Sequence, residues 1–245
     1  MKMTQTQFNE LAKLHKKWLE TDGRLGEQLI LRGEDLSYIR MAGKNLSKCI
    51  LTDCNICRTN CKNTNFEGAD LSESCIAHSE CQGANFKNAN LENTYCVETD
   101  FDNTNFEHSN ISNSKFGLSS FINANLSYAK ANNANFRYCD MTRVVAQSAN
   151  FNNSIMKNMN LYCAVLNHSK ISEVDLNDSN LDEAILLNTD FRYSNLSGCN
   201  LQTDISVAWF EDTCIKGAIM RLDDEISYNI PDESTKEYTE PVWCL

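Results

Sequence analysis

Apolar residues recur at every fifth position along most of this chain. From Leu31 to Leu201, all 35 positions of this series hold Leu, Ile, Met, Phe, Cys or Ala. Two residues before each of these, from Cys49 to Cys199, stands Ala, Ser, Thr, Cys or Val, with Met159 as the only exception. We call the apolar residues of the series the repeat centres. So regular a pattern indicates a structural repeat of five residues.

A five-residue period fits neither an α-helix nor a straight β-strand. On a helix, five residues advance by about 500°, so successive centres would scatter around the cylinder. On a strand, five is an odd number, so alternate centres would face opposite sides. All centres can face inward only if the chain bends once in each repeat. The period therefore predicts a solenoid in which each coil covers the apolar face of the previous coil.

The repeat resembles that of the pentapeptide-repeat family, whose loose consensus is A(D/N)LXX. Matching triplets are Ala69-Asp70-Leu71, Ala84-Asn85-Phe86, Ala89-Asn90-Leu91, Ala124-Asn125-Leu126 and Ser194-Asn195-Leu196. The resemblance implies an all-β solenoid, a right-handed quadrilateral β-helix with four repeats and hence twenty residues per coil. It covers roughly residues 29 to 222, so about nine to ten coils and a rod of roughly 45 Å are expected.

Coils of twenty residues would stack like residues in the interior of the rod. The expected interior columns are Phe66, Phe86, Phe106 and Leu126; Leu51, Leu71, Leu91 and Ile111; and Phe101, Phe121, Met141 and Leu161. The five-residue period is interrupted once, because one residue is missing after Gln202, and the period resumes at Thr203. One further coil follows the slip.

The segments on either side of the repeat region are expected to cover its ends. An open coil presents unpaired strand edges and bare core. Residues 1–28 are interpreted as a helical cap, with a partner-docking helix as the alternative, because apolar residues recur there at helical spacing up to Asp22-Gly23. The apolar residues of this predicted helix include Phe8, Leu11, Trp18 and Leu19.

Residues 223–245 form an acidic C-terminal segment with seven acidic residues and one lysine. Two interpretations stay open, a flexible tail and a capping strap in which Tyr228, Ile230 and Trp243 dock. In proteins that this chain resembles, this end often mediates dimerisation. The resemblance therefore implies a homodimer through the C-terminal end, with Trp209 as a further candidate contact.

Composition narrows the classes of partner. The net charge of −11 argues against direct binding to nucleic acid or to an anionic membrane, because both need a basic face. No stretch approaches the ~20 apolar residues that cross a bilayer, and the first residues lack the apolar core of a secretory signal. Twelve cysteines without such a signal predict free thiols in a cytoplasmic protein rather than a disulfide framework.

No candidate for catalysis or metal binding stands out from the repeat. The spacing of Cys49, Cys54, Cys57 and Cys61 is compatible with a metal or iron–sulfur site. The register already explains three of these cysteines as core residues, and only Cys57 points outward. No Ser/His/Asp grouping, phosphate-binding loop or carboxylate pair is apparent. We therefore expect no enzyme activity, no metal and no cofactor.

One outer column changes its chemistry along the rod. The residues just before the centres of one wall are Asn45, Asn65, Asn85, Asn105 and Asn125, followed by Val145, Val165 and Ile185, with Leu187 nearby. One interpretation is a choice of residues with β-propensity on an exposed wall. The other is an apolar contact strip for a partner, for a second copy or for the folded-back C-terminal segment.

Two functional hypotheses follow. The first is a non-catalytic scaffold that binds another macromolecule, a protein of unknown identity. The second comes from the resemblance, since some pentapeptide-repeat proteins imitate DNA, bind DNA gyrase and protect it from inhibitors. The charge weighs against the second hypothesis, because the repeat region carries only about −6, whereas duplex DNA of ~45 Å carries roughly 26 negative charges.

Overall fold

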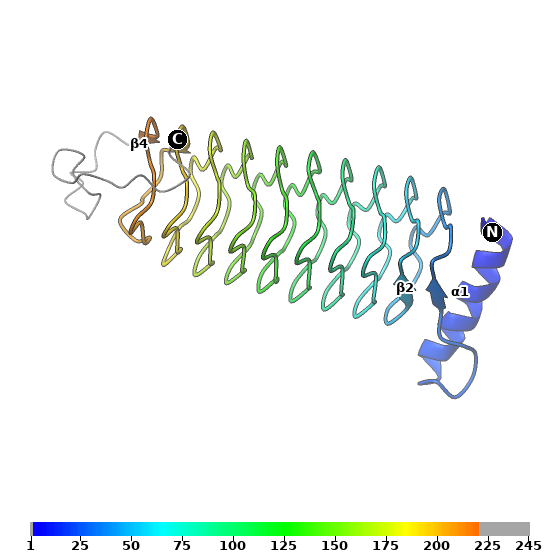
Figure 1. Ribbon diagram of the computed structural model, residues 1–245. Coiled ribbons are helices and arrows are strands. Elements are labelled where there is room, and N and C mark those ends of the chain that lie inside the picture. The colour runs from blue at the N-terminus through cyan, green and yellow to red at the C-terminus, as the bar shows by residue number, and fades with distance from the viewer. Residues whose placement is uncertain (1, 221–245) are drawn as a thin grey trace.

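The computed structural model describes residues 2–220, which form an N-terminal helix followed by a long stack of coils (Figure 1). Helix α1 spans Gln5–Glu20, and the strands are β1 (Ile30–Arg32), β2 (Ile50–Thr52), β3 (Asn200–Leu201) and β4 (Ile219–Met220). The expectations for Tyr228, Ile230 and Trp243 fall outside the described residues.

Parallel pairing holds successive coils together. Strand β1 pairs with β2 in parallel, and β3 pairs with β4 in the same way. Between these pairs, isolated parallel bridges join residues that lie twenty apart, such as Asn65 and Asn85. Each set of twenty residues contains four bridging positions, five residues apart. The twenty-residue coil is thereby confirmed, while its right-handed sense and the number of coils stay predictions.

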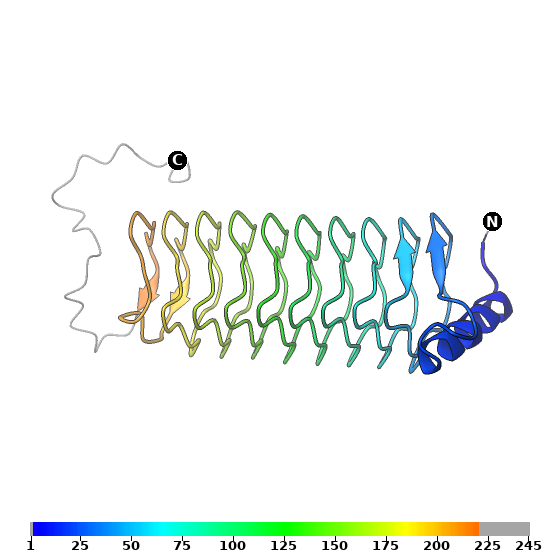
Figure 2. The same ribbon diagram turned by 90° about the horizontal axis from the view of Figure 1, so that it is seen from below.

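The slip in the sequence is also visible in the pairing. After Gln202 the separation between bridged residues falls to nineteen, as in the bridges Asp190–Trp209 and Asn195–Cys214. One residue is therefore missing from a single coil, and the bridged positions that follow, Trp209, Cys214 and Ile219, are again five residues apart. The last coil still stacks on the rod (Figure 2).

Asparagine allows the chain to bend once in each repeat. In the repeat around Asn88, the Ala89 N–H donates to the Phe86 carbonyl at 3.0 Å and closes a β-turn, and Asn88 has φ 57°. Positive φ values recur at this turn position along the rod, often at asparagine. Asparagine adopts this left-handed conformation more readily than most residues. This preference explains how a chain with only nine glycines turns so often.

The interior is a continuous stack of apolar side chains. All members of the three expected columns are buried. The rings of Phe66 and Phe86 stack with centroids 5.1 Å apart, and those of Phe86 and Phe106 with centroids 4.8 Å apart. A second stack joins Phe101 and Phe121 at 5.0 Å. Stacked aromatic pairs add to the free energy of burial, so each coil stabilises its neighbours.

Helix α1 covers the N-terminal end of the rod (Figures 1 and 2). The helix begins with a capping box, because the Thr4 side chain accepts from the Gln7 N–H and the Gln7 side chain accepts from the Thr4 N–H. The Gln5 side chain accepts from the Arg40 N–H at 2.8 Å and donates to the Arg40 carbonyl at 3.1 Å. Gln5 thus bonds backbone groups at the edge of the first coil, which would otherwise lack a neighbouring coil.

The inner face of α1 is anchored by two buried residues. Phe8 and His15 are fully buried, whereas Leu11, Trp18 and Leu19 are partly buried. His15 accepts from the Leu29 N–H through Nδ1 at 3.0 Å and donates to the Ser47 carbonyl through Nε2 at 2.9 Å. Burial lowers the pKa of His15, because a low-dielectric site disfavours the charged imidazole. The neutral ring therefore ties the helix to the linker and to the coils.

Candidate functional site

The wall that begins with Asn45 satisfies its own polar groups over its first half. The Asn85 side chain donates from Nδ2 to Oδ1 of Asn65 at 3.0 Å, one coil away. The same Oδ1 accepts from the Glu67 N–H at 3.1 Å. Equivalent bonds join Asn65 to Asn45 and Asn125 to Asn105. We call this wall the asparagine wall.

The asparagine wall becomes apolar in its second half. The parallel bridges continue through Asn125, Val145, Val165 and Ile185, so the column itself is unbroken. Val145 is 38% exposed, Ile185 52% and Leu187 43%, and Val165 is partly buried. We call Val145, Val165, Ile185 and Leu187 the apolar strip. The β-branched residues of this strip suit an extended chain, and the strip also offers an apolar surface for contact.

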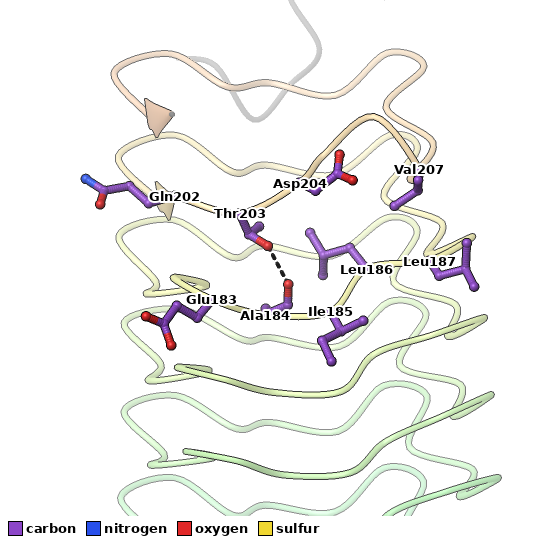
Figure 3. Close-up of a pocket in the computed structure, with 9 residues that line it drawn as sticks. All are labelled: Glu183, Ala184, Ile185, Leu186, Leu187, Gln202, Thr203, Asp204 and Val207. Carbon is purple, nitrogen blue, oxygen red and sulfur yellow. Dashed lines mark hydrogen bonds between the residues drawn. The ribbon is translucent and has the colours of Figure 1, made fainter. Parts of the chain in front are cut away.

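The apolar strip ends at a hollow, where the shortened repeat crosses the wall. The hollow has a volume of about 420 Å³. Figure 3 shows Ile185 and Leu187 on one side of it and Asp204 and Val207 on the next coil. The residues that line the hollow are Glu183, Ala184, Ile185, Leu186, Leu187, Gln202, Thr203, Asp204 and Val207.

The missing residue explains the hollow, because it breaks the backbone ladder at this place. In the preceding coil, the Leu166 N–H donates to the Ile185 carbonyl at 2.9 Å. The equivalent bond from the Leu186 N–H to the Asp204 carbonyl is absent, and within residues 2–220 the Leu186 N–H has no partner. The Thr203 hydroxyl donates to the Ala184 carbonyl instead. The two coils therefore separate only locally, because the Asn188 N–H again donates to the Val207 carbonyl at 2.7 Å.

A polar cluster beside the hollow was not predicted from the sequence. The Tyr162 hydroxyl and the Cys163 thiol both donate to Oε2 of Glu183, at 3.0 Å and 3.2 Å. The pKa of Tyr162 is raised to about 12, mainly by its hydrogen bond to Cys163 and secondly by its hydrogen bond to Glu183. The pKa of Cys163 is also raised, mainly by partial burial and secondly by its hydrogen bond to Glu183. A raised pKa keeps the thiol protonated and weakly nucleophilic. Adding twenty to the Cys163 position would have revealed the pairing with Glu183.

The expectation of free thiols throughout is wrong for one pair. Cys57 and Cys75 form a disulfide, with Cα atoms 5.8 Å apart. Cys57 lies in a turn and Cys75 just before the next coil's repeat centre, so both side chains point outward one coil apart. The outward direction of Cys57 was predicted, but its neighbour was not considered. The other cysteines among residues 2–220 are free, including the stacked pair Cys61 and Cys81.

Most of the free cysteines among residues 2–220 are core residues, whereas Cys163 and Cys214 are only partly buried. Cys49, Cys54 and Cys61 are buried, as their register predicts. Burial raises the pKa of the Cys96 thiol to about 12, because an apolar surrounding disfavours the thiolate. Within residues 2–220, no group of three or more His, Cys, Asp and Glu side chains is arranged to hold a metal ion.

The other predicted site residues lie away from the apolar strip. Trp209 is 50% exposed and belongs to the column of Asp190 on another wall, with the Arg192 guanidinium 5.5 Å from its ring centroid. Phe8, Leu11, Trp18 and Leu19 belong to α1 at the opposite end of the rod. Over the described part of the chain, no helix is both long and apolar enough to span a membrane.

The sequence matches one family model along most of the repeat region. The model describes pentapeptide repeats and matches in eight copies, over residues 35–78, 79–117, 119–158, 139–178 and 169–203. No curated protein matches the chain by sequence.

Among solved structures, the rod is similar to HetL, a pentapeptide repeat protein involved in heterocyst differentiation regulation in the cyanobacterium Nostoc sp. strain PCC 7120. The identity is 19% and the TM-score 0.50, over 84% of this chain and 94% of HetL. QnrB1, a plasmid-mediated fluoroquinolone resistance protein, matches at 17% identity and TM-score 0.41, over 80% of this chain and 92% of QnrB1. At these identities the similarity shows the fold alone.

Proposed function

Because the chain belongs to the pentapeptide-repeat family, we propose that it is a non-catalytic scaffold that binds a partner protein through the apolar strip. The change of the asparagine wall from self-bonded amides to exposed aliphatic side chains carries this proposal. In the first half of the wall, each Asn Oδ1 already accepts hydrogen bonds from its own wall, so little is left to attract a partner. In the second half, Val145, Ile185 and Leu187 expose apolar surface that a partner can cover.

The strip fits the central part of a protein interface. Aliphatic side chains that become fully buried each contribute roughly 1.5–3 kcal/mol, and a few such residues dominate most interfaces. The strip is straight, because parallel bridges fix Val145, Val165 and Ile185 one coil apart. A partner would therefore meet a flat, rigid row of side chains rather than a mobile loop.

Placing a charge in the strip is expected to abolish partner binding. In Val165→Asp, burial against a partner would desolvate a carboxylate, and we expect at least a tenfold loss of affinity. Asn105→Asp is the matched control, because it adds the same charge in the same column on the asparagine half. Affinity capture from the native host identifies the partner, and titration of that partner against both variants gives the change in affinity. Light scattering measures the oligomeric state of both variants and shows whether the partner is a second copy of this chain.

The contrary result is equally clear. If both variants retain the wild-type melting temperature, oligomeric state and affinity for every captured protein, the strip is only an extended wall and the proposal fails. If Asn105→Asp weakens binding as much as Val165→Asp, the partner senses charge along the whole wall rather than the strip.

The DNA-mimic alternative requires a continuous negative face, and the charges of the rod do not favour one. Lysines neutralise acidic residues on neighbouring coils, as in Lys87–Glu107 at 2.8 Å and Lys62–Glu80 at 2.9 Å. The asparagine wall adds no charge. We expect that the protein, added at about micromolar concentration, neither inhibits supercoiling by DNA gyrase nor protects the enzyme from a quinolone. Inhibition that weakens with added salt would support the mimic instead.

A further inference from the structure

A second exposed surface lies on the wall opposite the apolar strip. Its column runs through Tyr95, Lys115 and Asn135, which parallel bridges join one coil apart. Leu118 and Tyr138 occupy the turn that ends this wall, on successive coils. Both are 58% exposed, and no large apolar side chain among residues 2–220 is more exposed. Tyr95 is exposed as well, so large apolar side chains face solvent on neighbouring coils.

The turn gives Leu118 and Tyr138 an unfavourable backbone conformation as well as an exposed side chain. Leu118 has φ 63° and Tyr138 has φ 61°, in the left-handed region that bulky residues adopt less readily than asparagine. Asn158 has φ 55° at the same turn one coil later, so asparagine satisfies this turn. Neither the turn nor the core therefore requires a large apolar side chain at these two positions. Residues held in such conformations cluster at ligand-binding sites, and contact with a ligand would account for both.

Two cations without a carboxylate partner lie beside these apolar side chains. The Lys115 ammonium is 6.0 Å from the centroid of the Tyr95 ring, and Arg137 directly precedes Tyr138. Both cations are exposed, and within residues 2–220 neither forms an ion pair. We call Tyr95, Lys115, Leu118, Arg137 and Tyr138 the tyrosine–cation patch.

Carboxylates on the surrounding coils have partners of their own. The contacts are Glu98–His78 at 3.2 Å, Asp175–Lys157 at 3.1 Å and Asp140–Thr142 at 2.6 Å. The two cations of the patch therefore stay uncompensated in a chain whose net charge is −11. The patch is thus a small basic and aromatic surface on an acidic protein, and its charge is complementary to an anionic ligand.

The size of the patch favours a short acidic protein segment over a nucleic acid. Three coils cover about 10 Å along the rod, at about 4.8 Å per coil. A nucleic acid carries negative charge along its whole length and would continue onto Glu98 and Asp175, which lie in the same two columns. Charges are screened beyond about 8 Å at physiological salt. A segment with a few carboxylates close to Lys115 and Arg137 therefore escapes most of that repulsion.

We propose that the tyrosine–cation patch binds a short segment of a partner protein in which acidic residues flank an apolar residue. The carboxylates pair with Lys115 and with Arg137, whose guanidinium can bind a carboxylate through two parallel hydrogen bonds. The apolar side chain packs against Leu118 and Tyr138. Tyrosine and arginine are among the residue types that most often dominate the binding energy of protein interfaces. This inference does not rest on the proposed function, because the patch and the apolar strip lie on opposite walls.

Selection of peptides on the full-length protein tests the nature of the ligand. A phage library of random peptides of about ten residues, long enough to cross the patch, is first depleted on Leu118→Ala/Tyr138→Ala and then selected on the wild type. The depletion variant has the wild-type charge, so it does not bias the selection towards acidic peptides. We expect the enriched peptides to be acidic and to contain an aromatic or aliphatic residue. An enriched peptide should bind the wild type with a Kd of about 10 μM in fluorescence anisotropy.

Charge reversal separates pairing at the patch from general repulsion by the rod. We expect Lys115→Glu/Arg137→Glu to weaken binding of the enriched peptide by at least about tenfold. Lys130→Glu/Lys170→Glu is the matched control, because it reverses two charges in one column of the adjacent wall. The control should keep the wild-type affinity within about twofold. Unchanged circular dichroism melts verify that the variants remain folded.

Several outcomes would overturn the proposal. Absence of enrichment over the unselected library would mean that the patch binds no peptide, and neutral or basic enriched peptides would mean that the cations do not select the ligand. Equal losses of affinity in the two charge-reversed variants would mean that the peptide senses only the net charge. A single-stranded oligothymidine that binds more tightly than the peptide would assign the patch to nucleic acid. A wild-type dimer in light scattering that Leu118→Ala/Tyr138→Ala dissociates would assign the patch to a second copy.

Discussion

Replacing Phe121 with alanine is expected to lower the free energy of unfolding by about 3–5 kcal/mol, the range for truncation of a buried phenylalanine. Phe121 is completely buried at the middle of the rod. Its ring stacks on Phe101 with centroids 5.0 Å apart and meets the edge of Phe116 at 5.4 Å. A narrow core has few other side chains that could move into the space, so the cavity would persist. Urea denaturation followed by circular dichroism gives the loss.

Leu118→Ala is the matched control for this substitution. Leu118 lies three residues away in the same coil but is 58% exposed at a turn, so its truncation should change stability by less than about 0.5 kcal/mol. Similar losses for the two variants would mean that the aromatic stack contributes no more than the surface. In a solenoid each coil contacts only its neighbours, so the hydrogen-exchange rates should rise most in the coils next to Phe121.

The period of five was sufficient to predict the interior, because one geometric requirement governs every repeat. A centre such as Leu161 must face inward for the coil to close, and the structure buries it completely. The small residue two positions earlier must also fit inside. At several of these positions a polar side chain bonds within the core, as where the Ser74 hydroxyl donates to the Leu51 carbonyl at 2.6 Å. Within the described part of the rod, the buried hydroxyls of Ser109, Ser154 and Ser169 have no partner. The nineteen-residue separation between bridged positions after Gln202 also agrees with the one missing residue that counting the repeats revealed.

The sequence was less informative where the outcome depends on contacts between coils. The missing residue after Gln202 was visible, but the hollow was not, because it arises from a ladder bond that Leu186 loses. The Cys57–Cys75 disulfide joins a turn residue to an outward residue of the next coil. Register reasoning that compared only residues twenty apart could not pair two positions separated by eighteen. Glu183 and Cys163, in contrast, are twenty apart and could have been paired.

The attachment of helix α1 gives the second large expected effect, through Gly26. Gly26 has φ +79°, and a Cβ atom there would collide with the Leu14 carbonyl oxygen and lie 2.7 Å from the Trp18 nitrogen. Both are backbone atoms of α1 and cannot rotate away. The Glu27 N–H donates to the Leu14 carbonyl at 3.2 Å, so displacing the helix would also break this bond. Gly26→Ala should therefore lower the free energy of unfolding of the cap by at least about 2–3 kcal/mol.

Gly43→Ala separates this close contact from backbone strain alone. Gly43 has φ +67°, but nothing lies within 4 Å of its added Cβ, so alanine there should cost only about 1 kcal/mol. Hydrogen exchange should show faster exchange in Gly26→Ala for the amides of α1 and for Leu29, whose N–H is held by the buried His15. The coils beyond the first two should exchange as in the wild type. Equal effects of the two substitutions would mean that α1 moves freely away from the linker, and that the end of the rod is stable without it.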